Sequence, residues 1–193
     1  MNHPVQILPT ASTPFRFTVD QFLALCDQGL FDDYSKSELI DGEIVVMNAQ
    51  HSRHARVKSR LARRIGNALE LLGSPLEPQI AASVRMSDGS LPVSDIVLTS
   101  YRGAGLVPLE TVAMLIEVSD TTLDTDLGRK ADLYAKASVP EYWVVDLNEN
   151  RVLCHANPRP GDWGYDGQLD GLFGTTLYSA TVEGLSVETT GLE

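Results

Sequence analysis

Apolar and polar positions alternate along the chain with the periods of helices and strands, and the first half can be divided on that basis. A short helix is predicted near residues 18–29, where a capping-box pattern precedes apolar residues at helical spacing. Asp41-Gly42 separates two apolar-flanked runs and predicts a β-hairpin turn. Residues 52–72 have an apolar stripe with a period of 3.6 and predict the longest helix.

The second half of the chain is predicted to be mostly strands. Two antiparallel hairpins and one buried strand are expected, together with a helix capped by Asp124 or Thr125 and ending near Ala137. A loop is expected over 158–174, because Gly, Asp and Pro are frequent there, followed by an edge strand at 175–180. The fold class is therefore α/β or mixed α+β, with helices packed on one central mixed sheet. The expected strands are 80–86, 90–98, 112–118, 141–147 and 151–155.

Two of these apolar strands contain an acid that requires an explanation. Glu117 lies inside the run 112–118, and alternation places Asp95 on the same side as Val93 and Val97. A buried carboxylate without a partner is costly or becomes protonated, so a cation, a metal ion or a hydrogen-bond donor is expected beside each acid.

Lys130 is the expected partner of these acids. At 100° per residue it falls in the same arc as Leu127 and Tyr134, whereas Arg129 points away from that arc. An inward lysine one loop beyond a buried glutamate indicates that the two meet or share a ligand. A plain buried ion pair, or a lysine that extends to the rim of the core, would explain the pattern equally well.

Two buried acids and a lysine together favour a site for a divalent cation beside a phosphate. Mg²⁺ binds through few carboxylates and keeps several water molecules, while a lysine stabilises developing negative charge. Glu38 and Glu43 flank the predicted hairpin turn and are more often solvated. If one of them reaches the site, Glu43 is the better candidate because it begins the second run of the hairpin.

Composition sets the class of protein. The 193 residues, 43% hydrophobic and 21% charged, indicate a single domain over residues 15–193, preceded by a flexible arm at 1–14. No apolar run approaches the roughly 18 residues of a membrane span, and no secretion signal is recognised, so a cytoplasmic location is expected. The two cysteines suggest buried free thiols.

The net charge of −11 argues against a protein that coats nucleic acid through bulk electrostatics, but one segment is strongly basic. Five arginines lie beside the apolar stripe of the long helix. A solvated helix face would explain them, and so would a surface that binds phosphates bidentately. His51 and His54, at the start of the helix, are more often exposed or capping. The five arginines are Arg53, Arg56, Arg60, Arg63 and Arg64.

Nearly the whole chain resembles the Uma-type restriction endonucleases, a family of the PD-(D/E)XK nuclease superfamily. The motifs that support this resemblance are Glu38-Leu-Ile-Asp-Gly-Glu-Ile44, His51 and His54, the Asp95 segment, Ile116-Glu-Val-Ser119, Asp126 through Lys130 to Tyr134, and Val139-Pro-Glu-Tyr-Trp-Val-Val-Asp146. Together they are specific, although each alone is weak.

The resemblance implies a nuclease core in which Asp95 and Glu117 bind Mg²⁺, or Mn²⁺ in its place, and Lys130 assists hydrolysis of DNA. It also implies a homodimer. The superfamily usually has a lysine two residues after the second acid, where this chain has Ser119, so Lys130 of the following helix takes that role. Ser94 stands where the family more often has proline.

Two alternatives remain open at this point. The chain could be an inactive relative that retains the fold as a binding or assembly module, which the acidic charge and Ser94 favour slightly. It could also use the same three residues to hydrolyse a smaller phosphoester.

Overall fold

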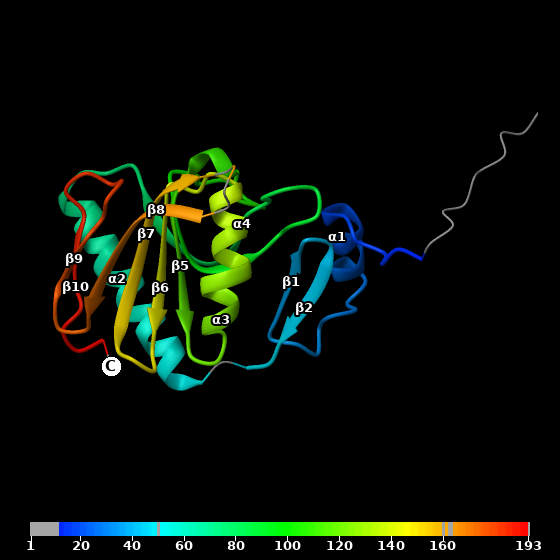
Figure 1. Ribbon diagram of the computed structural model, residues 1–193, viewed down its shortest axis with the longest axis horizontal. Helices are drawn as coiled ribbons and strands as arrows, with labels where there is room; N and C mark the ends of the chain where they lie inside the picture. Colours follow the sequence, from blue (N-terminus) through cyan, green and yellow to red (C-terminus); the bar gives the residue numbers. More distant parts are fainter. Residues whose placement is uncertain (1–11, 50, 160, 162–163, 193) are drawn as a thin grey trace, which may run out of the picture.

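A six-stranded mixed sheet forms the centre of the computed structural model, which describes residues 12–49, 51–159, 161 and 164–192 (Figure 1). Neighbouring strands are antiparallel except β5 and β6, which are parallel because a helical segment connects them. This confirms the predicted mixed sheet with flanking helices. The spatial order is β3 (Glu77–Ser83), β4 (Val93–Thr99), β5 (Val112–Ser119), β6 (Glu141–Asp146), β7 (Arg151–Arg159) and β8 (Gly164–Leu172).

The long helix α2 (Ser52–Leu71) covers one face of this sheet, as Figure 1 shows. Val57, Leu61 and Ile65 of its predicted apolar stripe are fully buried against side chains of the central strands, whereas Leu72 at the end of the stripe is 45% exposed. Burial of this stripe supplies the main packing energy on that face, since each fully buried aliphatic side chain contributes about 1.5–3 kcal/mol.

A shorter helical segment covers the opposite face. It runs through α3 (Leu123–Thr125), a π-helical turn η2 (Asp126–Lys130) and α4 (Ala131–Lys136). It begins two to three residues earlier than expected: Thr122 is the N-cap, and its side chain makes no capping hydrogen bond. The expected caps Asp124 and Thr125 therefore lie inside the helix. The predicted end at Ala137 is confirmed.

The N-terminal helix and hairpin form a separate unit beside the sheet (Figure 1). Helix α1 (Val19–Asp27) has the predicted capping box. Strands β1 (Lys36–Ile40) and β2 (Glu43–Met47) pair antiparallel through the predicted turn, where Asp41 and Gly42 both have positive φ, as a tight hairpin requires. This unit attaches to the rest through Leu39, which exchanges backbone hydrogen bonds with Leu91.

The C-terminal part differs from the prediction. The segment expected as a loop contains strand β8, because pairing with β7 satisfies its backbone despite the Gly- and Asp-rich composition. The last expected strand is β9 (Thr176–Tyr178), which pairs with β10 (Ser186–Glu188) outside the main sheet. A 3-10 turn, η1 (Leu109–Thr111), precedes β5.

The sequence also predicted a flexible N-terminal arm and found no membrane span. The arm expected at 1–14 lies outside the described residues except for 12–14, which are exposed and have no regular structure. Within the described ranges, no helix has the length and apolar character needed to cross a membrane.

Candidate active site

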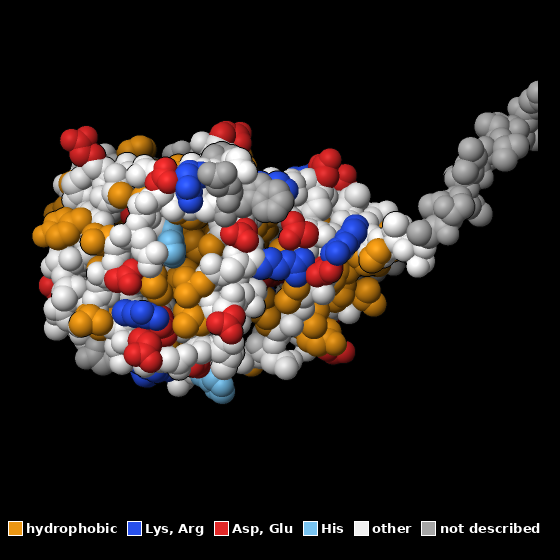
Figure 2. Space-filling view, viewed as in Figure 1, with side chains coloured by type: hydrophobic (Ala, Val, Ile, Leu, Met, Phe, Trp, Pro, Cys, Tyr) orange, Lys and Arg blue, Asp and Glu red, His pale blue; other side chains and the backbone are white. Residues whose placement is uncertain are grey.

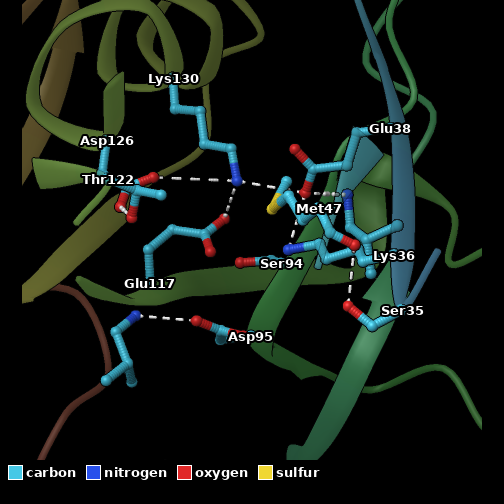
Figure 3. A network of polar contacts seen from close by, with 12 residues as sticks. Ser35, Lys36, Glu38, Met47, Ser94, Asp95, Glu117, Thr122, Asp126 and Lys130 are labelled. Atoms are coloured by element: carbon cyan, nitrogen blue, oxygen red, sulfur yellow. Dashed lines mark hydrogen bonds and ion pairs between the residues drawn. The ribbon is translucent and has the colours of Figure 1, made fainter. Parts of the chain in front are cut away.

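Asp95 and Glu117 lie together where β4 and β5 separate (Figure 3). The last backbone pair between these strands joins Ile96 and Ile116, one residue before the two acids. Beyond this pair, hydrogen bonds from side chains take the place of backbone pairing between β4 and β5. Asp95 Oδ2 accepts a hydrogen bond from the Val118 amide at 2.9 Å, and Ser94 Oγ, 3.3 Å from the Ile116 carbonyl oxygen, donates to it. Ser94, which stands where the resembling family more often has proline, thus makes a side-chain hydrogen bond that proline cannot make.

Lys130 points into the same place, as the helical periodicity predicted. Its side chain is almost fully buried, and its Nζ lies 3.1 Å from Glu117 Oε1 and 3.2 Å from Glu38 Oε1. The lysine therefore links an acid of the main sheet to an acid of the hairpin (Figure 3). The ammonium group of Lys130 is thus paired with the carboxylates of Glu117 and Glu38. This is the buried ion pair that the sequence had left as one alternative.

Glu38, and not Glu43, is the hairpin acid at the site. Glu38 is fully buried on the face of β1 that also presents Lys36 and Ile40, and it accepts from Lys36 Nζ at 2.8 Å. Glu43 is about half exposed and pairs with Arg16 and Arg129 on the outside of the hairpin. The preference for Glu43 was wrong because its strand faces solvent at that position, whereas alternation along β1 could have identified Glu38.

Asp126 is a site residue that sequence reasoning missed. The π-helical turn brings Asp126 and Lys130 to the same side, with 3.8 Å between Asp126 Oδ1 and Lys130 Nζ. Asp126 Oδ2 accepts hydrogen bonds of 2.6 Å from the hydroxyls of Ser119 and Thr122. Ser119, where the resemblance led us to expect a lysine, therefore orients an acid beside Lys130. A carboxylate four residues before an inward lysine was the available signal.

The first turns of α2 contribute two cationic or polar partners to Asp95. His54 Nε2 lies 3.1 Å from Asp95 Oδ2, and Lys58 Nζ lies 3.2 Å from Asp95 Oδ1. His54 is buried, contrary to the general expectation for this histidine, while His51 is exposed at the N-cap without a capping bond. Burial acts to raise the pKa of Asp95, but the His54 hydrogen bond and nearby Lys36 and Lys58 lower it well below its usual value.

The second acid has the opposite electrostatic character. Burial raises the pKa of Glu117 to about 7, although the charge of Lys130 acts against this shift. Burial alone would lower the pKa of Lys130, but the surrounding carboxylates raise it well above its usual value. Tyr134 donates a 2.8 Å hydrogen bond to Glu117 Oε1, so that oxygen has two donors. The site thus combines an ionised aspartate, a protonated lysine and a glutamate that titrates near neutrality.

These groups line a pocket of about 370 Å³ between the hairpin, the ends of β4 and β5, the π-helical turn and the start of α2. Five acids and two lysines contribute to the lining that the described residues form, so it attracts cations. The acids are Glu38, Asp95, Glu117, Asp120 and Asp126, and the lysines are Lys36 and Lys130.

The carboxylate oxygens of this pocket fit a hard cation, although they do not lie close enough together to form a metal centre as they stand. Among the residues with described positions, no three His, Cys, Asp or Glu side chains are close enough to hold an ion as they stand. However, Glu38 Oε2 is buried and has no hydrogen-bond partner in the part of the chain that the structure describes. The described hydrogen bonds of Glu117 involve only its Oε1. An oxygen ligand set of this kind suits Mg²⁺, which needs few carboxylates and completes its shell with water.

The arginines of α2 are only partly available as a phosphate-binding surface. Arg60 donates to the Gly191 carbonyl oxygen at 2.7 Å, and Arg64 donates to the carbonyl oxygens of Glu188 and Thr190, so both anchor the C-terminal segment. Arg53 donates to the Asn150 side chain in the β6–β7 turn. Arg56 and Arg63 are exposed. On the face seen in Figure 2, basic side chains stand beside acidic ones and form no continuous basic surface.

The six-stranded mixed sheet with helices on both faces defines a mixed α/β fold, in which buried acids converge with a helical lysine. The sequence model of the Uma2 family, described as "Putative restriction endonuclease", matches residues 19–188. The chain therefore belongs to this family, as its motifs indicated.

The comparison with solved structures agrees on the fold. A crystal structure from Anabaena variabilis, described as "a putative nuclease belonging to DUF820", aligns with a TM-score of 0.67 and 16% sequence identity. The match covers 91% of this chain and 97% of the other, so the fold is shared almost completely. No curated protein matches the sequence.

Proposed function

We propose that this protein is a metal-dependent endonuclease that hydrolyses DNA phosphodiester bonds in the pocket around Asp95, Glu117 and Lys130. The main support is the convergence of these residues from two strands and a helix on one cation-attracting pocket. Family membership supports a nuclease independently of that geometry. The buried Glu38 Oε2 without a partner adds a ligand position that a plain structural ion pair would leave unexplained.

Each side chain has a proposed role. Asp95, Glu117 and Glu38 would hold Mg²⁺, with Mn²⁺ as a substitute, and the bound ion would supply an activated water and charge neutralisation. Lys130 would stabilise the negative charge that develops on the phosphate, and Asp126 would orient that ammonium group. Lys58 and His54 hold Asp95 ionised and in place before the metal ion arrives.

Plasmid cleavage tests the proposal. The wild type is expected to cut DNA with Mg²⁺ or Mn²⁺ and to lose this activity in EDTA. Asp95→Asn, Glu117→Gln and Lys130→Met should each lower the rate by roughly 10²–10³-fold, as for the loss of one preorganised charge-stabilising group. Glu43→Gln on the same hairpin is the matched control, because Glu43 lies outside the pocket and should leave the rate unchanged. Equal cutting by all variants would refute the assignment.

A second candidate is a nuclease-fold module that binds or assembles without catalysis. The observation that favours it is the pairing of Asp95, whose two oxygens already contact Lys58, His54 and the Val118 amide. Calorimetry with Mg²⁺ separates the two functions: the endonuclease should bind the ion at millimolar concentration, with weaker binding by Glu38→Gln and Glu117→Gln. An inactive module should bind none.

We also propose that the protein is a homodimer. Large apolar side chains on β8 and β9 are exposed, namely Leu169, Leu172 and Tyr178. Sedimentation of the wild type and of Leu172→Glu tests the assembly: the variant should sediment as a monomer if this surface forms the interface.

A further inference from the structure

A second hollow of about 440 Å³ adjoins the active-site pocket. Both hollows are lined by Lys36, by Asp95 and by residues 47–49 at the end of strand β2 and just beyond it, so they form one groove with two lobes. The second lobe extends from this boundary across the end of β4 toward the edge strand β3, through Ala81 and Ser83. A substrate bound at the acids would therefore continue into it.

The two lobes differ in charge. The active-site lobe is lined by five acids and two lysines, whereas the described lining of the second lobe contains two lysines, Lys36 and Lys58, and a single acid, Asp95. That acid lies at the shared boundary and is itself paired with Lys58 at 3.2 Å. Lys36 is itself paired with Glu38 of the first lobe at 2.8 Å, so the described lining of the second lobe is less acidic than that of the first, with one more cation than acid.

The polar groups of the second lobe are those that bind phosphate oxygens. Besides the two lysines, its lining includes three serines and one asparagine, of which Ser35 already donates its hydroxyl to the Met47 carbonyl oxygen at 2.9 Å. Hydroxyl, amide and ammonium donors are the usual partners of nucleic-acid phosphates, and the apolar side chains beside them suit a sugar. These donors are Ser35, Ser37, Ser83 and Asn48.

The backbone of the lobe is strained at one position. Ala81 has a φ of +53°, although it lies inside strand β3 and is not a glycine. Regular pairs flank it, Ile80 with Ile96 and Ala82 with Ser94, so the strain falls opposite Asp95. A left-handed alanine costs about 1 kcal/mol, and such strain is concentrated at functional sites.

We propose that the second lobe binds the neighbouring phosphate of a nucleic-acid strand whose scissile phosphate lies at Asp95 and Glu117. This rests on the proposed endonuclease function and adds a subsite to it. The substrate is accordingly a polymer that occupies both lobes, rather than a single phosphoester. Lys36 belongs to both lobes and marks the point where the chain of phosphates passes from one to the other.

A charge introduced into the second lobe tests this subsite. Ser83→Glu places a carboxylate in the lobe, and Ser100→Glu is the matched control at an exposed position at the far end of β4. Rates with Mg²⁺ are compared for an oligothymidylate and for bis(4-nitrophenyl) phosphate, which has only one phosphate. Ser83→Glu should raise KM for the oligonucleotide about tenfold and leave the small ester unchanged, because like charges repel only in the occupied lobe.

Salt dependence gives a second readout. Loss of one phosphate contact on a single strand should reduce the slope of log affinity against log salt by about 0.7. Equal effects on both substrates, or an unchanged oligonucleotide KM and slope, would overturn the subsite. If Ser83→Glu does not fold, as judged by circular dichroism, Ser37→Glu in the same lobe decides in the same way.

The subsite and the proposed function fail in different ways. If the wild type cuts neither substrate, the endonuclease proposal fails. Oligonucleotide binding, measured by fluorescence anisotropy for the wild type and Ser83→Glu, then still tests the lobe. Tighter binding by the wild type supports it, and equal binding or no binding refutes it.

Discussion

Two buried glutamates, Glu141 and Glu38, show how the same residue type serves structure in one region and the site in another. Glu141, at the start of β6, accepts hydrogen bonds from neutral donors only: the Trp143 indole, the Ser179 hydroxyl, and backbone or hydroxyl groups of residues 180 and 181. Glu38 is as deeply buried, but its Oε1 contacts two lysines and the Val93 amide, and its Oε2 has no hydrogen-bond partner among the described residues.

The difference lies in what each carboxylate leaves unsatisfied. Both oxygens of Glu141 are saturated, and these bonds fix the C-terminal segment to the sheet. Glu38 faces a pocket with other acids and with lysines as counterions, which is why we propose it as a metal ligand. Burial alone therefore does not distinguish these two acids, whereas the unsatisfied oxygen of Glu38 does.

The largest expected effect separates these two acids by activity. Glu38→Gln keeps the shape of the side chain but removes its charge, so cleavage should fall roughly 100-fold, while the loss of a buried partner of Lys36 and Lys130 should lower the free energy of unfolding by about 1–3 kcal/mol. Single-turnover cleavage and urea denaturation of the same preparation measure both quantities. Unchanged cleavage by the folded variant would make Glu38 a structural residue like Glu141.

The converse change should act on stability alone. Glu141→Gln replaces an acceptor oxygen with an amide that faces hydrogen-bond donors, which should lower the free energy of unfolding by about 3 kcal/mol. Cleavage per folded molecule should remain at the wild-type level. Denaturation curves and rates at a temperature well below the transition would establish this, and a loss of activity without loss of stability would contradict it.

A third prediction concerns pH and Glu117. Its pKa of about 7 in the folded protein exceeds the usual 4.5, so the folded state binds this proton more tightly than the unfolded state. The stability from this group is therefore full below about pH 4.5 and is lost as the pH rises to about 7, by about 2–3 kcal/mol. The groups facing it are Lys130, Lys36, Tyr134, Asp95 and Asp126.

Glu117→Gln provides the matching measurement. In EDTA, the stability of the variant relative to the wild type should increase between pH 5 and pH 8 by this amount, because the variant has no carboxyl to ionise. A difference that stays constant across this range would mean that Lys130 keeps Glu117 ionised throughout, and the pair would then be an ordinary ion pair.

Local patterns in the sequence predicted the elements that form the site, because they depend on neighbouring residues. Periodicity placed the two acids in strands and Lys130 on the inner helical face, and family motifs agreed. The choice between Glu38 and Glu43 failed because it depends on how the hairpin packs against a distant part of the chain. Strand β8 likewise depends on pairing with β7, which its Gly- and Asp-rich composition does not indicate, whereas the spacing of Asp126 and Lys130 was a local signal.

The arginines of α2 are the case in which composition was least informative, and they give the smallest expected effect. Arg64 donates to two backbone carbonyl oxygens of the C-terminal segment, so Arg64→Ala should lower the free energy of unfolding by about 1 kcal/mol and leave DNA affinity unchanged. Arg63→Ala, at the exposed neighbouring position, should change stability by less than about 0.5 kcal/mol. Urea denaturation and the salt dependence of DNA binding measure the two effects. A reduced salt slope for Arg64→Ala would return this residue to the phosphate-facing role that the cluster of arginines first suggested, since a side chain committed to the C-terminal segment cannot also neutralise a phosphate.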